Sequence, residues 1–222
     1  MSNSSPLLEV QDVGYQLGGT TLLKPVSLTL NVGEYLLITG PSGSGKSTLL
    51  KIIASLIDAT QGRIFFKGQP AAAMRPEFWR QHISYCFQSP VLFGETVYDN
   101  LALPWQIRQQ SVKDDALRRD LEKVELPADM LHKRIGQLSG GEKQRVALLR
   151  HLQFLPDVLL LDEITSALDE ENRARIDRLI AGLVKEKGVA VIAVSHQSKE
   201  IAEAANVVTL PPPERGEADG SA

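Results

Sequence analysis

The chain has 222 residues, of which 43% are hydrophobic and 23% charged, and its formal net charge is −3. These values are those of an ordinary globular protein with one substantial core, or a core and a modest subdomain. The weak negative charge does not favour a nucleic-acid partner. The single cysteine, Cys86, excludes an internal disulfide and is compatible with a reducing compartment.

The hydropathy pattern predicts no direct membrane insertion. No apolar run reaches the ~18 residues of a spanning helix, and the first six residues lack the charged and apolar regions of a signal peptide. We therefore expect the chain neither to span a membrane nor to be exported by that route. A membrane role would then come through a partner.

The pattern of residues 7–39 is typical of short strands and turns. Alternating apolar residues at 8–10 and 26–30 predict strands, with a Gly18-Gly19 turn between them. The apolar run at residues 35–39 predicts a further strand.

A glycine-rich stretch follows residues 35–39 and leads into a helical pattern at residues 48–56. Its glycines let successive N–H groups point inward at a helix N-terminus, where the helix dipole also favours phosphate. This context favours nucleoside triphosphate binding over a plain surface turn, with Lys46 reaching the terminal phosphates and Ser47 ligating Mg²⁺. The predicted binding residues are Gly40, Pro41, Ser42, Gly43, Ser44, Gly45, Lys46, Ser47 and Thr48.

The helix after this loop is predicted to bury one face, formed by Leu49, Ile52, Ile53 and Leu56. The chain that follows has short β-type and helical patterns up to Gln88. From about residue 90 to residue 134 it changes to a helical insertion with an amphipathic stretch. The later patterns predict β segments at 62–68 and 83–87, helices at 75–80, 112–124, 140–154 and 170–187, and strands at 158–161, 189–194 and 206–210.

Polar residues directly follow three predicted strands of the sheet. Ligand sites in open parallel sheets lie at the carboxyl ends of the strands, so these residues are site candidates. Asp162 is predicted to associate with Mg²⁺, and Glu163 to orient or deprotonate an attacking water. His196 is placed to donate to a γ-phosphate or hold that water. The alternatives are a helix N-cap for the acidic pair, a structural histidine, and a solvated turn at Gln88.

A second anion-binding pattern lies at Ser139-Gly140-Gly141, which precedes an amphipathic run. Exposed N–H groups and a serine cap at a helix N-terminus can bind an anion, although the pattern is also an ordinary helix start. A chain with one phosphate loop has little need of a second, lysine-free anion site.

Taken together, these motifs resemble, in order and spacing, the ATP-binding-cassette (ABC) ATPases. The resemblance covers about residues 7–210 and implies an α/β P-loop NTPase fold, with a RecA-like core, an N-terminal antiparallel β subdomain and an α-helical subdomain inserted at about 90–140. We expect one domain over residues 1–210 and a disordered tail at 211–222. The motifs are residues 40–47, Gln88, residues 138–145, residues 159–163, residues 166–169 and His196.

The resemblance also implies roles in a head-to-tail, ATP-dependent homodimer. Ser139, Gly140 and Gly141 would close on the γ-phosphate held by the glycine loop of the other copy. Tyr15 lies where the family places an aromatic residue against adenine, although it could equally be a core residue. Gln88 matches the glutamine that senses Mg²⁺ and the attacking water. Asp169 matches an aspartate that communicates across the dimer.

Within the family, residues 84–88, 96–101, 103–108 and 162–166 resemble ATP-binding subunits of the bacterial Fet-type iron exporters. Position 164 is isoleucine in this chain, as in this subgroup, whereas most cassettes have proline there. The resemblance implies an ATPase with ATP and Mg²⁺ as cofactors that powers a separate membrane permease for iron export. The ATPase would lie in the cytoplasm, held at the inner membrane through that permease. The alternatives are an importer or lipoprotein-release ATPase, or a soluble cassette acting on ribosomes or DNA.

Overall fold

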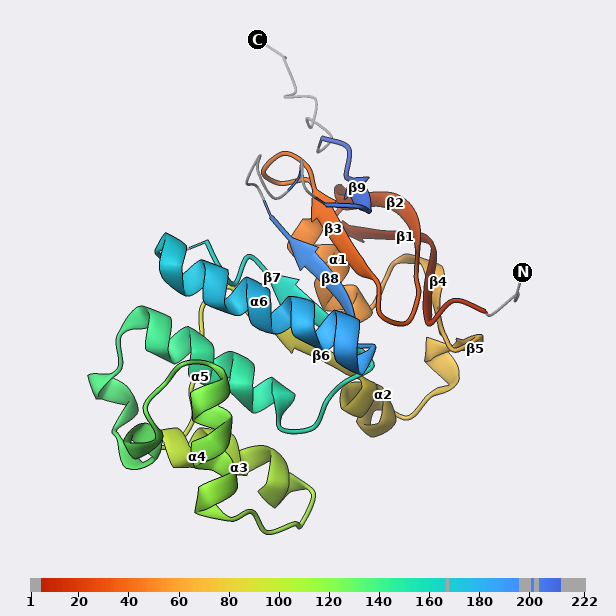
Figure 1. The fold of residues 1–222 in the computed structure, drawn as a ribbon. Helices are drawn as coiled ribbons and strands as arrows, with labels where there is room; N and C mark the ends of the chain where they lie inside the picture. The colour runs from red at the N-terminus through yellow and green to blue at the C-terminus, as the bar shows by residue number, and fades with distance from the viewer. Residues whose placement is uncertain (1–4, 167, 196–200, 202–203, 213–222) are drawn as a thin grey trace.

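The computed structural model describes residues 5–166, 168–195, 201 and 204–212 (Figure 1). These residues form two sheets. An antiparallel sheet has the strand order β2-β1-β4-β5, and a parallel sheet has the order β6-β7-β8-β3-β9. The arrangement is the α/β P-loop NTPase fold predicted from the sequence.

The antiparallel sheet contains β1 (Leu8–Leu17), β2 (Thr20–Leu30), β4 (Gln61–Phe66) and β5 (Gln69–Pro70). The parallel sheet contains β3 (Tyr35–Thr39), β6 (Ile83–Cys86), β7 (Val158–Asp162), β8 (Ala190–Val194) and β9 (Val207–Thr209). The main helices are α1 (Lys46–Ile53), α2 (Pro76–His82), α3 (Val97–Ile107), α4 (Asp114–Lys123), α5 (Gly140–Leu152) and α6 (Glu170–Lys187).

The parallel sheet is covered on both faces, and every residue of β7 and β8 is buried. Side chains alternate along a strand, so each strand serves two apolar clusters. Leu160 and Ile192 pack in a cluster with α1 and the antiparallel sheet. Leu159 and Val191 pack in a second cluster with α6, which crosses the sheet in Figure 1. This double burial explains why both strands are continuous apolar runs.

The helical insertion has its own apolar cluster, to which α3, α4 and α5 contribute Val97, Leu101, Leu117, Leu121 and Leu149. Its two ends are joined because Val97 N donates to Lys133 O at 3.1 Å and Ile135 N donates to Glu95 O at 2.9 Å. A capping box of Thr96 and Asp99 begins α3. The insertion therefore emerges from the core and returns to it at one place.

The structure corrects two local expectations. Leu56 is 47% exposed and does not share the buried face of α1, because the helix ends at Ile53 and Ser55 has a φ of 56°. The strand predicted at 83–87 ends at Cys86, and Phe87 is 43% exposed. Within the described residues, no helix is both long enough and apolar enough to cross a lipid bilayer.

Candidate functional site

The carboxyl ends of β3, β6 and β7 bring together residues that are far apart in the sequence. The Ser47 hydroxyl donates to Asp162 Oδ1 at 2.9 Å, and Gln88 Nε2 donates to Glu163 Oε2 at 3.1 Å. Ser47 lies at the start of α1, directly after the glycine loop. The structure therefore joins the loop and two of the predicted strand-end sites into one candidate site.

The backbone of the glycine loop tolerates no side chain at two positions. Gly40 has a φ of 141°, and a Cβ there would lie 2.8 Å from Leu210 O. Gly45, the N-cap of α1, has a φ of 91°, and a Cβ there would lie 2.5 Å from Leu22 O. Glycine is required at both because the conformation is left-handed and another backbone segment approaches closely. The resulting loop presents its N–H groups at the start of α1.

Lys46 is buried and lies inside the loop. Its Nζ donates to Gly40 O at 3.0 Å and to Pro41 O at 2.9 Å. Burial lowers the pKa of Lys46, and the charges of Glu163 and Asp162 oppose this effect. The ammonium is thus held at the loop by carbonyl oxygens and nearby carboxylates.

A cavity of about 320 Å³ opens at the glycine loop and is lined by Leu22, Ser42, Gly43, Gly45, Lys46, Ser47, Thr48 and Glu163. Leu22 was not predicted, because it reaches the loop from a distant hairpin strand. Tyr15 is not among these lining residues. It is half-buried on β1, packs against the main apolar cluster and pairs with Leu23, the neighbour of Leu22.

Asp162 is held on both sides of its carboxylate. Oδ1 accepts the Ser47 hydroxyl, and Oδ2 accepts the hydroxyl of Tyr85 at 2.6 Å. Tyr85 is buried on β6, and its pKa is raised by burial and by Asp162, so its hydroxyl is a donor at neutral pH. This pair was not predicted from the sequence, because 77 positions separate the two residues. The only signal was a polar-tipped aromatic residue in a strand next to Gln88.

Glu163 adopts a φ of 51°, which is uncommon for a non-glycine residue. Such backbone conformations cost on the order of 1–3 kcal/mol and often occur at functional sites. The turn after Glu163 is closed by Ser166, whose N–H and hydroxyl both donate to Glu163 O. The turn holds Glu163 at the edge of the loop cavity, where its carboxylate accepts a hydrogen bond from Gln88.

Ser139, Gly140 and Gly141 do not line the loop cavity. Ser139 is exposed and caps α5, with its hydroxyl accepting from Glu142 N at 3.2 Å and its N–H donating to Glu142 Oε2 at 2.6 Å. Within one chain, the second anion-binding pattern is therefore separate from the first. Its N-terminal N–H groups remain available to an outside ligand at an exposed helix end.

The two remaining predicted site residues, Asp169 and His196, are not among the described residues that line the loop cavity. Asp169 is exposed and caps α6, since its carboxylate accepts from Asn172 N at 2.8 Å and from Asn172 Nδ2 at 2.6 Å. These hydrogen bonds lower the pKa of Asp169. His196 lies outside the described residues.

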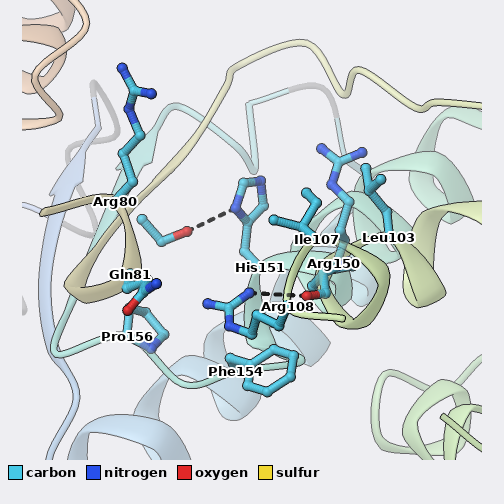
Figure 2. A pocket seen from close by; sticks show the side chains of 11 residues that line it. Arg80, Gln81, Leu103, Ile107, Arg108, Arg150, His151, Phe154 and Pro156 are labelled. Carbon is cyan, nitrogen blue, oxygen red and sulfur yellow. Dashed lines mark hydrogen bonds between the residues drawn. The ribbon is translucent and has the colours of Figure 1, made fainter. Parts of the chain in front are cut away.

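A separate pocket of about 190 Å³ lies where α2, α3 and α5 meet, and Figure 2 shows its side chains. Three of its lining residues are arginines, namely Arg80, Arg108 and Arg150, and no lining residue is acidic. Arg150 is 9% exposed and donates to Val91 O at 2.8 Å and to Asn100 Oδ1 at 3.2 Å. Because these acceptors are neutral, the buried guanidinium is hydrogen-bonded but not paired with a carboxylate. The pocket is electropositive.

His151 forms part of this pocket and lies with Nδ1 2.8 Å from Ser84 Oγ (Figure 2). Burial, and secondarily the charge of Arg150, lowers the pKa of His151 to about 4. In an unfolded chain a histidine titrates near ~6.5. The unfolded state therefore binds the proton more readily, and the folded state loses stability as the pH falls from about 6.5 towards 4.

We expect His151→Gln to weaken this pH dependence. Between pH 7.5 and 4.5, the wild-type free energy of unfolding should fall by on the order of 2 kcal/mol more than that of the variant, because carboxylate titrations are common to both. Urea unfolding of both proteins at the two pH values measures the difference. Equal pH dependence would show that His151 is not kept neutral by the fold.

The donor set at the glycine loop fits Mg²⁺. Ser47 and Asp162 offer adjacent oxygen ligands, which hard cations prefer. Mg²⁺ typically takes one or two protein carboxylates and completes its shell with phosphates and water. The described residues contain no cluster of three or more His, Cys, Asp or Glu side chains suited to a metal ion. A cation at this site would thus be shared with a phosphate ligand.

The sequence profile described as "ABC transporter" matches residues 23–166. The chain belongs to the ABC transporter ATPase family. It is an ABC ATP-binding subunit with ATPase chemistry, and ATP is its nucleotide. The matched region contains the glycine loop, Gln88 and the Asp162-Glu163 pair, which the fold brings together, and it also contains Ser139.

Relatives of this ABC ATPase extend the likeness over nearly its whole length. The chain is 53% identical to the probable iron export ATP-binding protein FetA of Escherichia coli K12, over 96% of this chain and 94% of that protein. It is 36% identical to the spermidine/putrescine import ATP-binding protein PotA of Haemophilus ducreyi, over 87% of this chain but 52% of PotA.

A solved structure also resembles this ABC ATPase. It is the dimeric, post-hydrolysis ATP-binding cassette MJ0796 bound to ADP and Pi, with a TM-score of 0.81 and 29% identity. The likeness covers 94% of this chain and 99% of that one. The fold is therefore that of an ATP-hydrolysing cassette.

Proposed function

We propose that this ABC ATPase powers iron export through a separate membrane permease, working at the cytoplasmic face of the membrane. The observation that carries the proposal is the likeness to the E. coli iron export protein, which spans 96% of this chain. No described residue cluster suggests iron binding by the ATPase itself, so the cargo would be handled by the permease. Import of a cargo, as the name of PotA indicates for that protein, is the alternative direction.

For hydrolysis, we assign roles from the contacts at the site. The loop N–H groups and Lys46 bind the phosphates, and Ser47, Asp162 and Gln88 serve the Mg²⁺ that neutralises phosphate charge when it is bound. Glu163 accepts a proton from the attacking water, and its hydrogen bond with Gln88 at 3.1 Å orients its carboxylate. The family resemblance, rather than a contact, supports two further proposed roles: His196 would donate to the γ-phosphate, and Tyr15 would stack on adenine.

The remaining assigned residues act between two copies of the chain. The exposed N-terminus of α5, with Ser139, Gly140 and Gly141, completes the phosphate site of the other copy, and Asp169 lies beside that interface. Support comes from the separation of α5 from the loop cavity and from the dimeric assembly of the similar solved cassette. A site shared across an isologous interface makes each copy contribute half of two sites.

The arginine pocket is the place where the permease docks. Exposed apolar side chains lie around it, including Ile107 at 70% exposed and Leu155 at 49%, and such patches mark interaction sites. Its three arginines favour a partner segment that carries carboxylates.

Reconstitution with a candidate membrane permease tests the proposal. In proteoliposomes, we expect ATP hydrolysis to rise with Fe²⁺ and to drive Fe²⁺ away from the side that carries the ATPase. Absence of iron-dependent flux, or flux towards the ATPase side, would contradict iron export without affecting the ATPase assignment.

The same vesicles test docking through the charge reversal Arg108→Glu. Arg108 stacks on Phe154 at the pocket edge and is remote from the glycine loop. We expect permease affinity to fall by about 10-fold or more, with the permease-free ATPase rate unchanged. Arg119→Glu on α4, which does not line the pocket, is the control of equal charge change. Equal affinities of the two variants would contradict docking here.

A further inference from the structure

Tyr85 contacts the candidate metal site at Asp162, on the carboxylate oxygen that Ser47 does not use. It lies on β6, which pairs in parallel with β7, and Tyr85 is opposite Leu160, two residues before Asp162. This register lets the tyrosine hydroxyl reach Asp162 Oδ2 at 2.6 Å. On the opposite side of the carboxylate, Ser47 reaches Oδ1 at 2.9 Å. Two elements, β6 and α1, thus hold one carboxylate.

The surroundings fix both partners of this contact. Tyr85 is 7% exposed and Asp162 is 5% exposed. The Tyr85 ring meets Phe87 edge-on, with ring centroids 4.7 Å apart, and packs in the main apolar cluster with α1. A buried carboxylate oxygen without a donor is unfavourable, and Tyr85 supplies the only hydrogen bond to Oδ2 among the described residues.

We propose that Tyr85 is a positioning residue for the metal-associated carboxylate: its hydroxyl holds Oδ2, so that Oδ1 faces Ser47 and the cation of Mg·ATP. The proposal rests on the assignment of Mg²⁺ to Ser47 and Asp162. Tyr85 itself touches neither nucleotide nor metal. Hydrogen bonds to metal-ligating carboxylates orient the ligand, and their loss typically lowers metal affinity by about 10–100-fold.

The substitution Tyr85→Phe isolates the hydroxyl, because the ring and its packing remain. We expect the affinity for ATP in EDTA to stay within about twofold of wild type, since the loop and Lys46 are untouched. The gain in affinity on adding Mg²⁺ should shrink by about 10-fold or more. Fluorescent ATP titrations with Mg²⁺ and with EDTA measure both, and the electron paramagnetic resonance spectrum of Mn²⁺ with the non-hydrolysable analogue AMP-PNP reports the metal environment directly.

Controls separate this role from a structural one. Tyr98→Phe removes a hydroxyl from α3, in the helical insertion, and should leave the Mg²⁺ gain unchanged. Tyr85→Met is a second hydroxyl-free variant with an adaptable apolar side chain, and it serves if the Tyr85→Phe protein does not fold well. Thermal unfolding confirms that each variant is folded.

Three results would overturn the inference. If adding Mg²⁺ increases the ATP affinity of both Tyr85 variants as much as that of wild type, the hydroxyl does not position Asp162. An equal loss of affinity in EDTA and in Mg²⁺ would show a purely structural role. A wild-type protein without any Mg²⁺ gain would refute the proposed metal site itself, and that outcome is distinguishable because it appears before any substitution is made.

Discussion

Glu163→Gln is expected to lower the rate of ATP hydrolysis by about 100-fold or more while leaving ATP binding intact. Glutamine keeps the size of the side chain and can still hydrogen-bond to Gln88, but it cannot accept a proton from water. General-base catalysis typically contributes about 10²–10⁴-fold. Phosphate release under saturating ATP and Mg²⁺ measures the rate, and nucleotide titration measures binding.

The same variant should accumulate as an ATP-bound dimer, because the step that consumes ATP is slowed. Size-exclusion chromatography with light scattering detects the change in mass on adding ATP and Mg²⁺. Glu122→Gln, on the outer surface of α4, is the matched control and should behave as wild type. A Glu163→Gln protein that stays monomeric and hydrolyses ATP at the wild-type rate would refute both the proposed base and the dimer.

A mixture of two inactive variants is expected to regain activity if the site is shared between copies. Lys46→Ala disables the glycine loop of its own chain, and Ser139→Arg disables the α5 end that it offers to a partner. Each alone should lose about 100-fold or more in turnover. A mixed dimer contains one site with an intact loop and an intact Ser139.

Random pairing at equal concentrations makes half of the dimers mixed, each with one of two sites intact, so recovery should approach about a quarter of wild-type turnover if the sites act independently. The measurement is ATP turnover against mixing ratio. The baseline is the turnover of each variant alone, diluted to the same concentration in the same buffer. If the mixture is no more active than its components, either each site is complete within one chain or both sites must be intact together. Mixing the inactive Lys46→Ala variant with wild type distinguishes the two explanations. Only a requirement for two intact sites predicts that the variant lowers the turnover of the wild-type chains with which it pairs.

The sequence predicted those parts of the site that are local in the chain. The glycine loop and the polar residues after β6 and β7 were identified because strand, turn and ligand residue lie within a few positions. The Tyr85–Asp162 contact and the arginine pocket were not, because each depends on elements that only the fold brings together. Likewise, Leu56 was misplaced because periodicity does not indicate where a helix ends.

The helix α3 shows a different limit of sequence reading. The insertion as a whole was expected to be helical, but α3 was not predicted as a separate helix. Its many apolar residues and the internal Pro104 obscure the helical pattern. Proline removes one helical hydrogen bond and usually disfavours an interior position. Here the capping box at Thr96 and the buried Asn100, which bonds to Phe93 and to Thr96, secure the first turns. Tertiary contacts override the local preference.

The two hydrogen bonds of Lys46 to Gly40 O and Pro41 O have a consequence for nucleotide affinity. An ammonium has three N–H donors, so the two carbonyl oxygens leave one donor for a phosphate. The carbonyl contacts hold Nζ in place before a nucleotide arrives, so less side-chain entropy is lost when a phosphate binds.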